Sequence, residues 1–479
     1  MEQRKMRIVL VIGLFVALVS GIAMATEAQE PAADDWLSGF RNPAPGIEMG
    51  LNIRLRSITA RNITTLDTTN KDNKWNFQRY RTRWWTKWML DDDVDFNTRM
   101  VWEFRTWDEP SSKPQHTDFD EILFDNFNFK LRNLFDMPLT ATIGRQDMLM
   151  TYGVGWLVMD GTPLDGSRTF YFDAARFTYD WEEKDTTIDL VYIDNAAASD
   201  RWLKPINDRD RIVTEQDERG AILYLTNQAN EKTKVEAYFM YKNDNPIDIA
   251  PGDRYNGFAP YWTRKAEIFT FGGAVAQSPN ENWNYRIEGA IQTGEKSERN
   301  DSPGDMSTGI MQDMEAFGAL TNLEYLFHDS YNSSAHIGYE YASGDDPDTD
   351  DNEQFDLLWA EWPRWSELYI YTYVPETMIA ESTNLHRINL GHKFNPNKKW
   401  QICTDYHLLW ADENTGTHLI NVSDSSKFRG QLITCWAKYR FSKQLWGHIL
   451  GEYFMPDNYY EKSNRDDAFF FRFNLEYAF

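Results

Sequence analysis

The chain has 479 residues and a formal net charge of −25, and aromatic residues make up 15% of it. Such acidity argues against nucleic acid as a partner, because a phosphate backbone attracts basic surfaces. The aromatic content argues against disorder, since disordered acidic chains lack aromatic residues. The only two cysteines, Cys403 and Cys435, are too few for a disulfide framework.

The N-terminus has the three parts of a secretory signal peptide. Three basic side chains lie within residues 4–7, an uncharged apolar run follows over residues 8–22, and residues 23–25 have the small-x-small pattern of a cleavage site. We therefore predict a signal peptide over residues 1–25 and a short N-terminal periplasmic segment over residues 26–45. The alternative is a membrane anchor, for which the apolar run is short, because a spanning helix needs about 20 residues.

After this spacer, apolar and polar side chains alternate in one segment after another. In the last segment, Phe471, Phe473 and Leu475 share one side, and Arg472 and Asn474 share the other. A transmembrane β-strand has this pattern because its apolar side faces lipid and its polar side faces the lumen. Eighteen such segments can be counted, at residues 46–58, 76–90, 95–108, 119–131, 138–148, 171–182, 186–195, 219–228, 233–243, 264–277, 282–294, 313–327, 332–344, 381–394, 400–412, 427–441, 445–457 and 466–479.

The links between these segments alternate in length. Every second link is short, such as residues 91–94 and 442–444, whereas the longest links include residues 149–170 and 345–380. Short periplasmic turns opposite long extracellular loops are typical of bacterial barrels. The sequence therefore predicts an all-β fold, a single 18-stranded antiparallel transmembrane β-barrel over residues 46–479, in the bacterial outer membrane.

The fifteenth and sixteenth segments also predict a strand pairing. If they form a hairpin about the middle of their loop, Thr404 faces Cys435 and Cys403 faces Trp436. The two cysteines then point to opposite faces and do not bond to each other. The last strand ends at Phe479, which resembles the signal read by the barrel assembly machinery of the outer membrane. That machinery and outer-membrane lipid are predicted partners.

Basic residues alternate with apolar residues in the first three predicted strands. A charge on the lipid side at mid-depth costs about 2–4 kcal/mol, so these side chains are predicted to face the lumen. Arginine suits an anion path, because its planar guanidinium binds carboxylates with two hydrogen bonds and stays charged. The alternative is a set of lumen charges that pair with acidic residues and make the barrel rigid. The candidates are Arg54, Arg56, Arg79, Arg81, Arg83, Lys87, Arg99 and Arg105.

The sequence contains no motif of a nucleophilic, metal-dependent or phosphate-binding enzyme, and we predict neither an enzyme nor a cofactor. Asp346, Asp348 and Asp350 alternate in one loop, which suits calcium. The loop lacks the glycine and the terminal glutamate of an EF-hand, which favours a solvated acidic loop without metal. The loops also carry tryptophans that either stack on sugar rings or lie at the membrane interface. They are Trp156, Trp359, Trp362 and Trp365.

Several short motifs resemble one family when they are taken together in their order. They are Gly144-Arg145-Gln146, Tyr152-Gly153, Arg168, Phe172-Asp173-Ala174-Ala175-Arg176-Phe177, Tyr341-Ala342-Ser343-Gly344-Asp345-Asp346 and Phe355-Asp356. The family is the alginate-export family of outer-membrane porins, and the resemblance covers residues 46–479. It implies a monomeric barrel with an arginine-lined constriction. It also implies outward passage of an anionic uronate polymer, handed over by a periplasmic polysaccharide synthesis and secretion complex.

By position, the resemblance adds Arg145, Arg168 and Arg176 to the candidates for the constriction. Arg145 has the same strand parity as Ile143, which is predicted to face lipid, so a β-bulge is needed to turn Arg145 inward. The sequence also departs from the family. The alginate exporter type closes its periplasmic side with a long turn between the last two hairpins, and here that link is only residues 442–444. This favours a more open pore, for an acidic glycan or a smaller organic anion.

We therefore predict a passive, anion-selective channel for an acidic, alginate-like polysaccharide or its oligomers, operating in export. A general or carboxylate-uptake porin is the first alternative. A surface adhesin or a barrel enzyme is the second. A TonB-dependent receptor is disfavoured, because residues 26–45 are too few for the globular plug domain that this class needs.

Overall fold

The computed structural model describes most of the chain. The described ranges are residues 35–113, 116–117, 121–148, 151–159, 171–198, 201–208, 216–246, 265–297, 310–360, 363–369, 383–414, 422–423 and 425–479. The predicted signal peptide lies outside them. Of the segment 26–45, residues 35–45 are described and contain one short helix, α2 (Asp35–Arg41).

Eighteen long strands form the wall, and a two-residue strand, β4 (His116–Thr117), lies beside the third of them. The wall strands are β1 (Ile47–Arg61), β2 (Lys74–Met89), β3 (Val94–Glu109), β5 (Leu123–Leu131), β6 (Leu139–Gln146), β7 (Phe172–Trp181), β8 (Thr186–Asn195), β9 (Gln216–Asn230), β10 (Thr233–Pro246), β11 (Ala266–Gln277), β12 (Trp283–Ser297), β13 (Met311–Leu326), β14 (Ser334–Ala342), β15 (Leu385–Asn397), β16 (Trp400–Trp410), β17 (Phe428–Arg440), β18 (Leu445–Pro456) and β19 (Ala468–Ala478).

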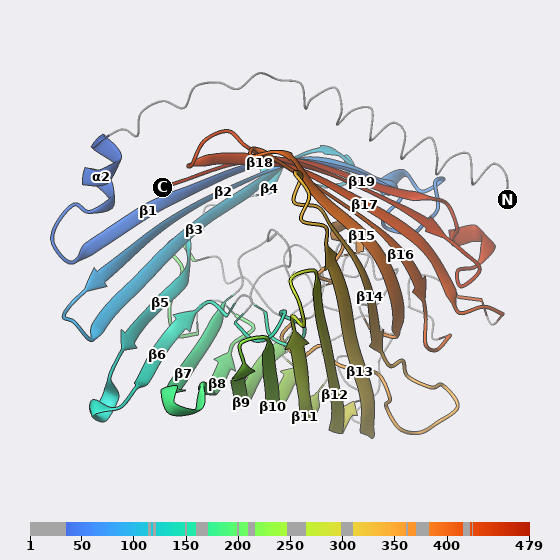
Figure 1. Ribbon diagram of the computed structural model, residues 1–479. Helices are drawn as coiled ribbons and strands as arrows, with labels where there is room; N and C mark the ends of the chain where they lie inside the picture. Colours follow the sequence, from blue (N-terminus) through green and yellow to red (C-terminus); the bar gives the residue numbers. More distant parts are fainter. Residues whose placement is uncertain are drawn as a thin grey trace.

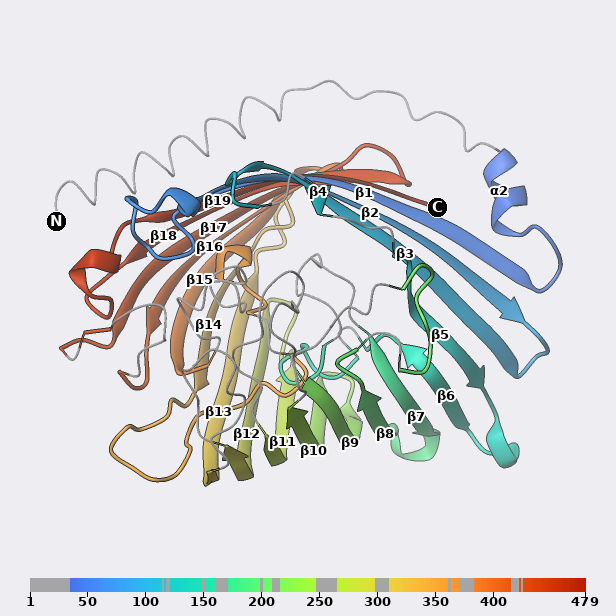
Figure 2. The same ribbon diagram turned by 180° about the vertical axis from the view of Figure 1, so that it is seen from behind.

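The wall closes on itself. Each wall strand pairs antiparallel with its neighbours, and β1 pairs with β2 on one side and with β19 on the other. Figures 1 and 2 show this ring of strands around an interior that holds loop segments. The predicted closed antiparallel β-barrel of eighteen strands is confirmed, and each predicted segment overlaps one wall strand. The sequence did not predict β4, which is too short to show a periodic pattern.

The alternation of residue types sets the two faces of the wall. In β1, Ile53 and Leu55 are 37% and 43% exposed, whereas Arg54 and Arg56 are 0% and 2% exposed. Successive side chains of a strand point to opposite faces, so the apolar residues form the outer surface and the arginines point inward. No helix of the described part of the chain is long and apolar enough to cross a membrane.

The connections differ between the two ends of the barrel. At one end, the links are as short as residues 398–399 and 441–444, and we call it the short-turn end. In the hairpin of β16 and β17, Thr404 pairs with Cys435 and Cys403 with Trp436, as predicted. Both cysteines are free thiols, which confirms that they do not bond to each other.

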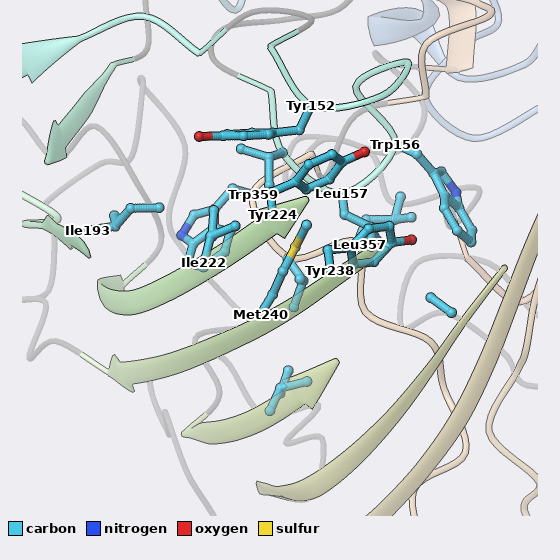
Figure 3. Close-up of a cluster of buried hydrophobic side chains, with 14 of the residues drawn as sticks. Tyr152, Trp156, Leu157, Ile193, Ile222, Tyr224, Tyr238, Met240, Leu357 and Trp359 are labelled. Atoms are coloured by element: carbon cyan, nitrogen blue, oxygen red, sulfur yellow. The ribbon is translucent and has the colours of Figure 1, made fainter. Parts of the chain in front are cut away.

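Two long connections from the opposite end fold into the interior. Residues 151–159 and 355–369, as far as they are described, meet at a bridge between Val158 and Trp359. Figure 3 shows Tyr152 of the first segment beside Tyr224 of the wall, with ring centres 4.9 Å apart. These residues belong to one buried apolar cluster with inner residues of β7 to β14. The interior is therefore partly filled by loops that the wall itself anchors.

Candidate functional site

The structure places the predicted basic residues of β1 to β3 on the inner face of the wall, and we call them the arginine stripe. Its members are Arg54, Arg56, Arg79, Arg81, Arg83, Lys87, Arg99 and Arg105. The register sets Arg54 opposite Arg81 and Arg56 opposite Arg79, so side chains of like charge lie next to one another. Arg54, Arg56, Arg79 and Arg81 are buried, and the other four are half-buried.

One carboxylate, that of Glu103, is shared by two arginines at the centre of the stripe. Its Oε1 accepts a hydrogen bond of 2.7 Å from Nε of Arg79 and lies 3.3 Å from Nη2 of Arg54. A second carboxylate, Glu476 on β19, has its Oε1 3.5 Å from Nη2 of Arg81. Because a buried charge without a partner is strongly destabilising, these pairs keep the central arginines in fixed positions.

The half-buried part of the stripe also pairs with acidic residues. Nε of Arg99 lies 2.6 Å from Oδ1 of Asp125, and Nη1 of Arg99 lies 2.7 Å from Oδ2 of Asp147. Nη2 of Arg83 lies 3.5 Å from Oδ2 of Asp125. The lumen charges therefore do pair with acidic residues, which was the structural alternative for the stripe. This pairing reduces the charge that the stripe presents to a solute.

The remaining candidates on the inner wall differ in the kind of contact that they make. Nζ of Lys87 lies 3.6 Å from Oδ2 of Asp95, whereas the guanidinium of Arg105 lies 5.8 Å from the centre of the Phe77 ring. Arg168 lies outside the described residues.

A left-handed glycine turns Arg145 inward. Arg145 has the same parity as Ile143, yet Ile143 is exposed on the outer face and Arg145 is buried against Asp173, with Nε to Oδ1 at 2.8 Å. Gly144 between them has a φ of +120°, and a Cβ there would lie 2.4 Å from the carbonyl oxygen of Phe127. Only glycine adopts this backbone without strain. Arg145 does point inward, but β6 pairs with β5 and with β7 without a register shift at Gly144, so the predicted β-bulge is wrong and the glycine backbone alone turns the side chain.

Arg176 joins this second group of arginines, on β7. Its Nε lies 3.0 Å from Oδ1 of Asp189, and its guanidinium lies 5.9 Å from the centre of the Tyr152 ring. The hydroxyl of Thr178 also donates to the carboxylate of Asp189, at 2.5 Å. Arg145 and Arg176 are thus each paired with an aspartate of the wall.

A further basic cluster lies on β15 and on the loop segment 363–369, which we call the inward loop, and the sequence did not predict it. Nη2 of Arg387 lies 2.8 Å from Oε2 of Glu340, and Nη2 of Arg364 lies 3.5 Å from Oε1 of the same residue. Burial and the nearby Arg387 lower the pKa of the Arg364 guanidinium, while Glu340 raises it. Here, too, two guanidiniums share one carboxylate. Each residue alone had no special spacing in the sequence, so only the fold brings them together.

A cavity of about 480 Å³ lies beside this cluster, and we call it the inner cavity. Arg364, Arg387, Trp365, Trp436 and His407 are among its lining residues. The guanidinium of Arg387 lies 5.0 Å from the centre of the Trp365 ring. Aromatic faces beside guanidiniums form a surface that suits a carboxylated ring.

The loop tryptophans were predicted either to stack on sugar rings or to lie at the membrane interface, and neither prediction describes all of them. Trp156 is 1% exposed and stacks on Phe355 with ring centres 5.3 Å apart, and Trp359 is also buried. Both are packing residues of the interior, so the prediction that they stack on sugars or lie at the membrane interface is wrong. Trp365 lines the inner cavity. Trp362 lies outside the described residues.

The inward loop is tied to the wall by a buried carboxylate. Oε1 of Glu452 on β18 accepts from the backbone N–H of Glu367 at 2.9 Å, and Oε2 accepts from that of Leu368 at 3.0 Å and from the hydroxyl of Ser366. Oε1 of Glu367 lies 2.9 Å from Nη1 of Arg472. This loop segment is therefore held against the wall as a fixed part of the lumen.

The acidic side chains of the loop 345–351 are not gathered into a cluster of metal ligands in the described part of the chain. Among the described residues, no three histidine, cysteine, aspartate or glutamate side chains are placed to hold a metal ion, Asp346, Asp348 and Asp350 included. The end of the loop instead enters the lumen, where Oδ2 of Asp356 lies 2.7 Å from Nζ of Lys296. Burial by itself raises the pKa of Asp356, but Lys296 and Lys242 outweigh it and lower that pKa below its ordinary value.

Comparisons with known proteins agree with this geometry. The sequence profile of a family described as alginate export matches residues 46–432. The fold is similar to that of Acinetobacter baumannii OccAB1, with a TM-score of 0.55 and 11% identity over 91% of this chain and 97% of that chain. It is equally similar to a BenF-like porin from Pseudomonas fluorescens Pf-5, with a TM-score of 0.55 and 11% identity over 91% of this chain and 98% of that chain. Pseudomonas aeruginosa OpdO has a TM-score of 0.53 and 10% identity over 90% of this chain and 97% of that chain. No curated protein sequence matches this chain.

Proposed function

We propose that the lumen of this protein is a passive path for an acidic polysaccharide or its oligomers. The chain belongs to the alginate export family, and the proposal starts from that membership. The protein is an outer-membrane β-barrel channel. In bacterial barrels the short turns face the periplasm, so the short-turn end is the periplasmic end. Export is the direction that the family description supports.

One observation carries the proposal: guanidiniums share carboxylates on the inner wall. Arg54 and Arg79 share Glu103, and Arg364 and Arg387 share Glu340. Each group therefore keeps an excess of positive charge after its ion pairs are formed. Arginine and lysine side chains that line a pore favour the passage of anions. The proposal assigns the path to the stripe, to Arg145 and Arg176, and to Arg168 by family resemblance.

Uptake of small carboxylates is a second candidate function. The link between β17 and β18 is only residues 441–444, so it offers no long turn to close the periplasmic end. The inner cavity, at about 480 Å³, has room for an organic anion as well as for a short glycan segment. A channel for uptake and a channel for export share the same lumen chemistry, and the two differ in the size of solute that passes.

Planar-bilayer recording tests the proposal. In a gradient of potassium chloride, the reversal potential of the purified protein is expected to show preference for chloride over potassium. Cation preference would overturn the proposal and leave the arginines as structural partners of lumen carboxylates. Currents carried by uronate monomers and by uronate oligomers then distinguish export of a polymer from uptake of small carboxylates. A polymer exporter is expected to pass both solutes, whereas an uptake porin is expected to pass the monomer alone.

A further inference from the structure

The periplasmic mouth has a basic sector that is separate from the arginine stripe. Five cations lie on β17 and on the two short turns that connect β15 to β16 and β17 to β18. They are Lys398, Lys399, Lys438, Arg440 and Lys443. Other turns at this end are acidic, such as residues 91–93 between β2 and β3 and residues 182–185 between β7 and β8. One side of the mouth therefore concentrates positive charge in an acidic protein.

Register places two of these cations on the lumen side. Lys438 pairs across the sheet with His448, which pairs with Asn474, the hydrogen-bond partner of Arg56. Arg440 lies two residues further along β17 and so has the same orientation. It pairs with Trp446 of β18. Lys438 and Arg440 therefore point into the mouth and not toward lipid.

These cations keep their charge available. Lys438 and Arg440 are exposed, and neither forms an ion pair with any carboxylate in the described ranges of the chain. Lys398, Lys399 and Lys443 also form no ion pair with a described carboxylate, and Lys398 and Lys443 are exposed while Lys399 is half-buried. In contrast, the central arginines of the stripe are buried beside glutamates. Exposed cations at a pore mouth raise the local concentration of anions and speed their capture.

A second cavity lies beside this sector and shares lining residues with the inner cavity. It measures about 570 Å³, and its lining includes all five cations together with Trp400, Trp436 and Trp446. Trp436 and Lys438 also line the inner cavity, so the two cavities adjoin at these residues. Nζ of Lys438 lies 5.0 Å from the centre of the Trp436 ring. We call the combined surface the mouth trough.

A buried donor at the inner end of the trough lacks a partner. His407 lines the inner cavity and is 1% exposed. Its Nδ1 lies 3.2 Å from Nη1 of Arg387, and because a guanidinium only donates, Nδ1 accepts and the neutral ring carries its proton on Nε2. Nε2 has no hydrogen-bond partner within the described residues. A buried donor without a partner is costly, so this atom suits an oxygen atom of a solute.

We propose that the mouth trough is the site at which a carboxylated glycan chain is captured from the periplasm. The exposed cations attract the carboxylates, Trp436 and Trp446 stack on sugar rings, and Arg364, Arg387 and His407 receive the leading end. The proposal rests on the proposed function, because it assumes an anionic glycan as the solute. Beyond the proposed function, it states that the glycan enters from the periplasmic end and that residues outside the arginine stripe bind it.

Current block by sugar oligomers tests the trough. Oligogalacturonate of defined length is the anionic probe, and maltooligosaccharide of the same length is the neutral one. Each is added to one face at a time of channels inserted in a known orientation. We expect oligogalacturonate to block more strongly from the periplasmic face than from the extracellular face. Equal block from both faces, in a channel that still prefers chloride, would overturn the trough and leave the proposed function intact.

Two charge variants locate the site. Lys438→Gln combined with Arg440→Gln is expected to weaken periplasmic block by oligogalacturonate about fivefold, since two exposed charge contacts are lost. Lys184→Gln combined with Lys232→Gln removes the same charge from other periplasmic turns and is the matched control, expected to block as the unmodified channel does. Equal weakening in both variants would show that only net charge matters, and it would overturn the site.

A third variant separates stacking from charge. Trp446→Leu keeps all cations of the trough and removes one aromatic face. We expect it to weaken block by both probes, whereas the double charge variant weakens block by oligogalacturonate alone. Gel migration before and after heating checks that each variant is folded. If folded Trp446→Leu leaves both blocks unchanged, the aromatic part of the proposal is wrong.

Discussion

The arginine stripe and the mouth trough are both basic, but they hold their charges in different ways. Arg54 and Arg79 are buried and share the carboxylate of Glu103. Lys438 and Arg440 are exposed and form no ion pair with the described carboxylates. Part of the charge of the stripe is therefore neutralised inside the wall, while the exposed cations of the trough stay open to a solute.

The difference teaches that burial, rather than residue type, decides whether a charged side chain of the lumen stabilises the barrel or binds a solute. Taking a charge out of water is expensive, and only a close partner compensates for it. An exposed cation has no such cost, but each of its contacts is weak and is screened by salt. Changes in the stripe are thus expected to alter stability, and changes in the trough are expected to alter affinity.

Removal of the shared carboxylate is expected to have the largest effect. Glu103→Gln leaves Arg54 and Arg79 buried without their anion, which is expected to lower the free energy of unfolding by about 3–5 kcal/mol. Urea titration of the refolded barrel measures this. Glu48→Gln is the control, because Glu48 lies on the same face of the wall and forms no ion pair with the described residues. It is expected to change the same quantity by less than about 0.5 kcal/mol. Similar losses of unfolding free energy in Glu103→Gln and Glu48→Gln would show that the shared ion pairs do not stabilise the stripe.

Exchange of one cation for another is expected to change stability less than loss of Glu103, and to change it in the stripe but not in the trough. Arg79→Lys keeps the charge but loses the hydrogen bond from Nε to Glu103, which is expected to cost about 1.5–3 kcal/mol of stability. Lys438→Arg keeps the charge at an exposed position, and neither stability nor oligogalacturonate block is expected to change measurably. The same two assays check both variants. A loss of block in Lys438→Arg would mean that the trough depends on geometry as the stripe does.

Much of the fold could be predicted because strand parity is a local property. It placed Arg54 and Arg56 on the inner face, and hairpin symmetry set Thr404 opposite Cys435. Arg145 was the exception, and the left-handed φ of Gly144 explains it. A glycine in a strand is a visible signal of such an irregularity.

Parity does not predict how deeply an inward side chain is buried. The buried Arg472 lies beside Glu367, which belongs to a loop that folds back from the far end, and no period in the sequence marks such loops. The same loops make Trp156 and Trp359 packing residues. The trough was missed for a related reason. Lys438 alternates with Trp436 in a predicted strand, but its neighbours Lys398 and Lys399 come from another hairpin, and only the closed wall brings them to one cavity.

Ionic strength provides the mildest test of the comparison, because it changes no residue. The screening length falls from about 10 Å at 0.1 M salt to about 3 Å at 1 M salt. Exposed Lys438 and Arg440 act on a solute through water, so periplasmic block by oligogalacturonate is expected to weaken on the order of tenfold over this range. The pairs of Arg79 and Arg54 with Glu103 are buried at contact distance, where mobile ions do not enter. The urea midpoint of the barrel is therefore expected to stay nearly constant. In the variant with Lys438→Gln and Arg440→Gln, block is already weak and is expected to depend less on salt. If the urea midpoint fell in parallel with block, the stripe would be as accessible to salt as the trough, and the two regions would not differ in kind.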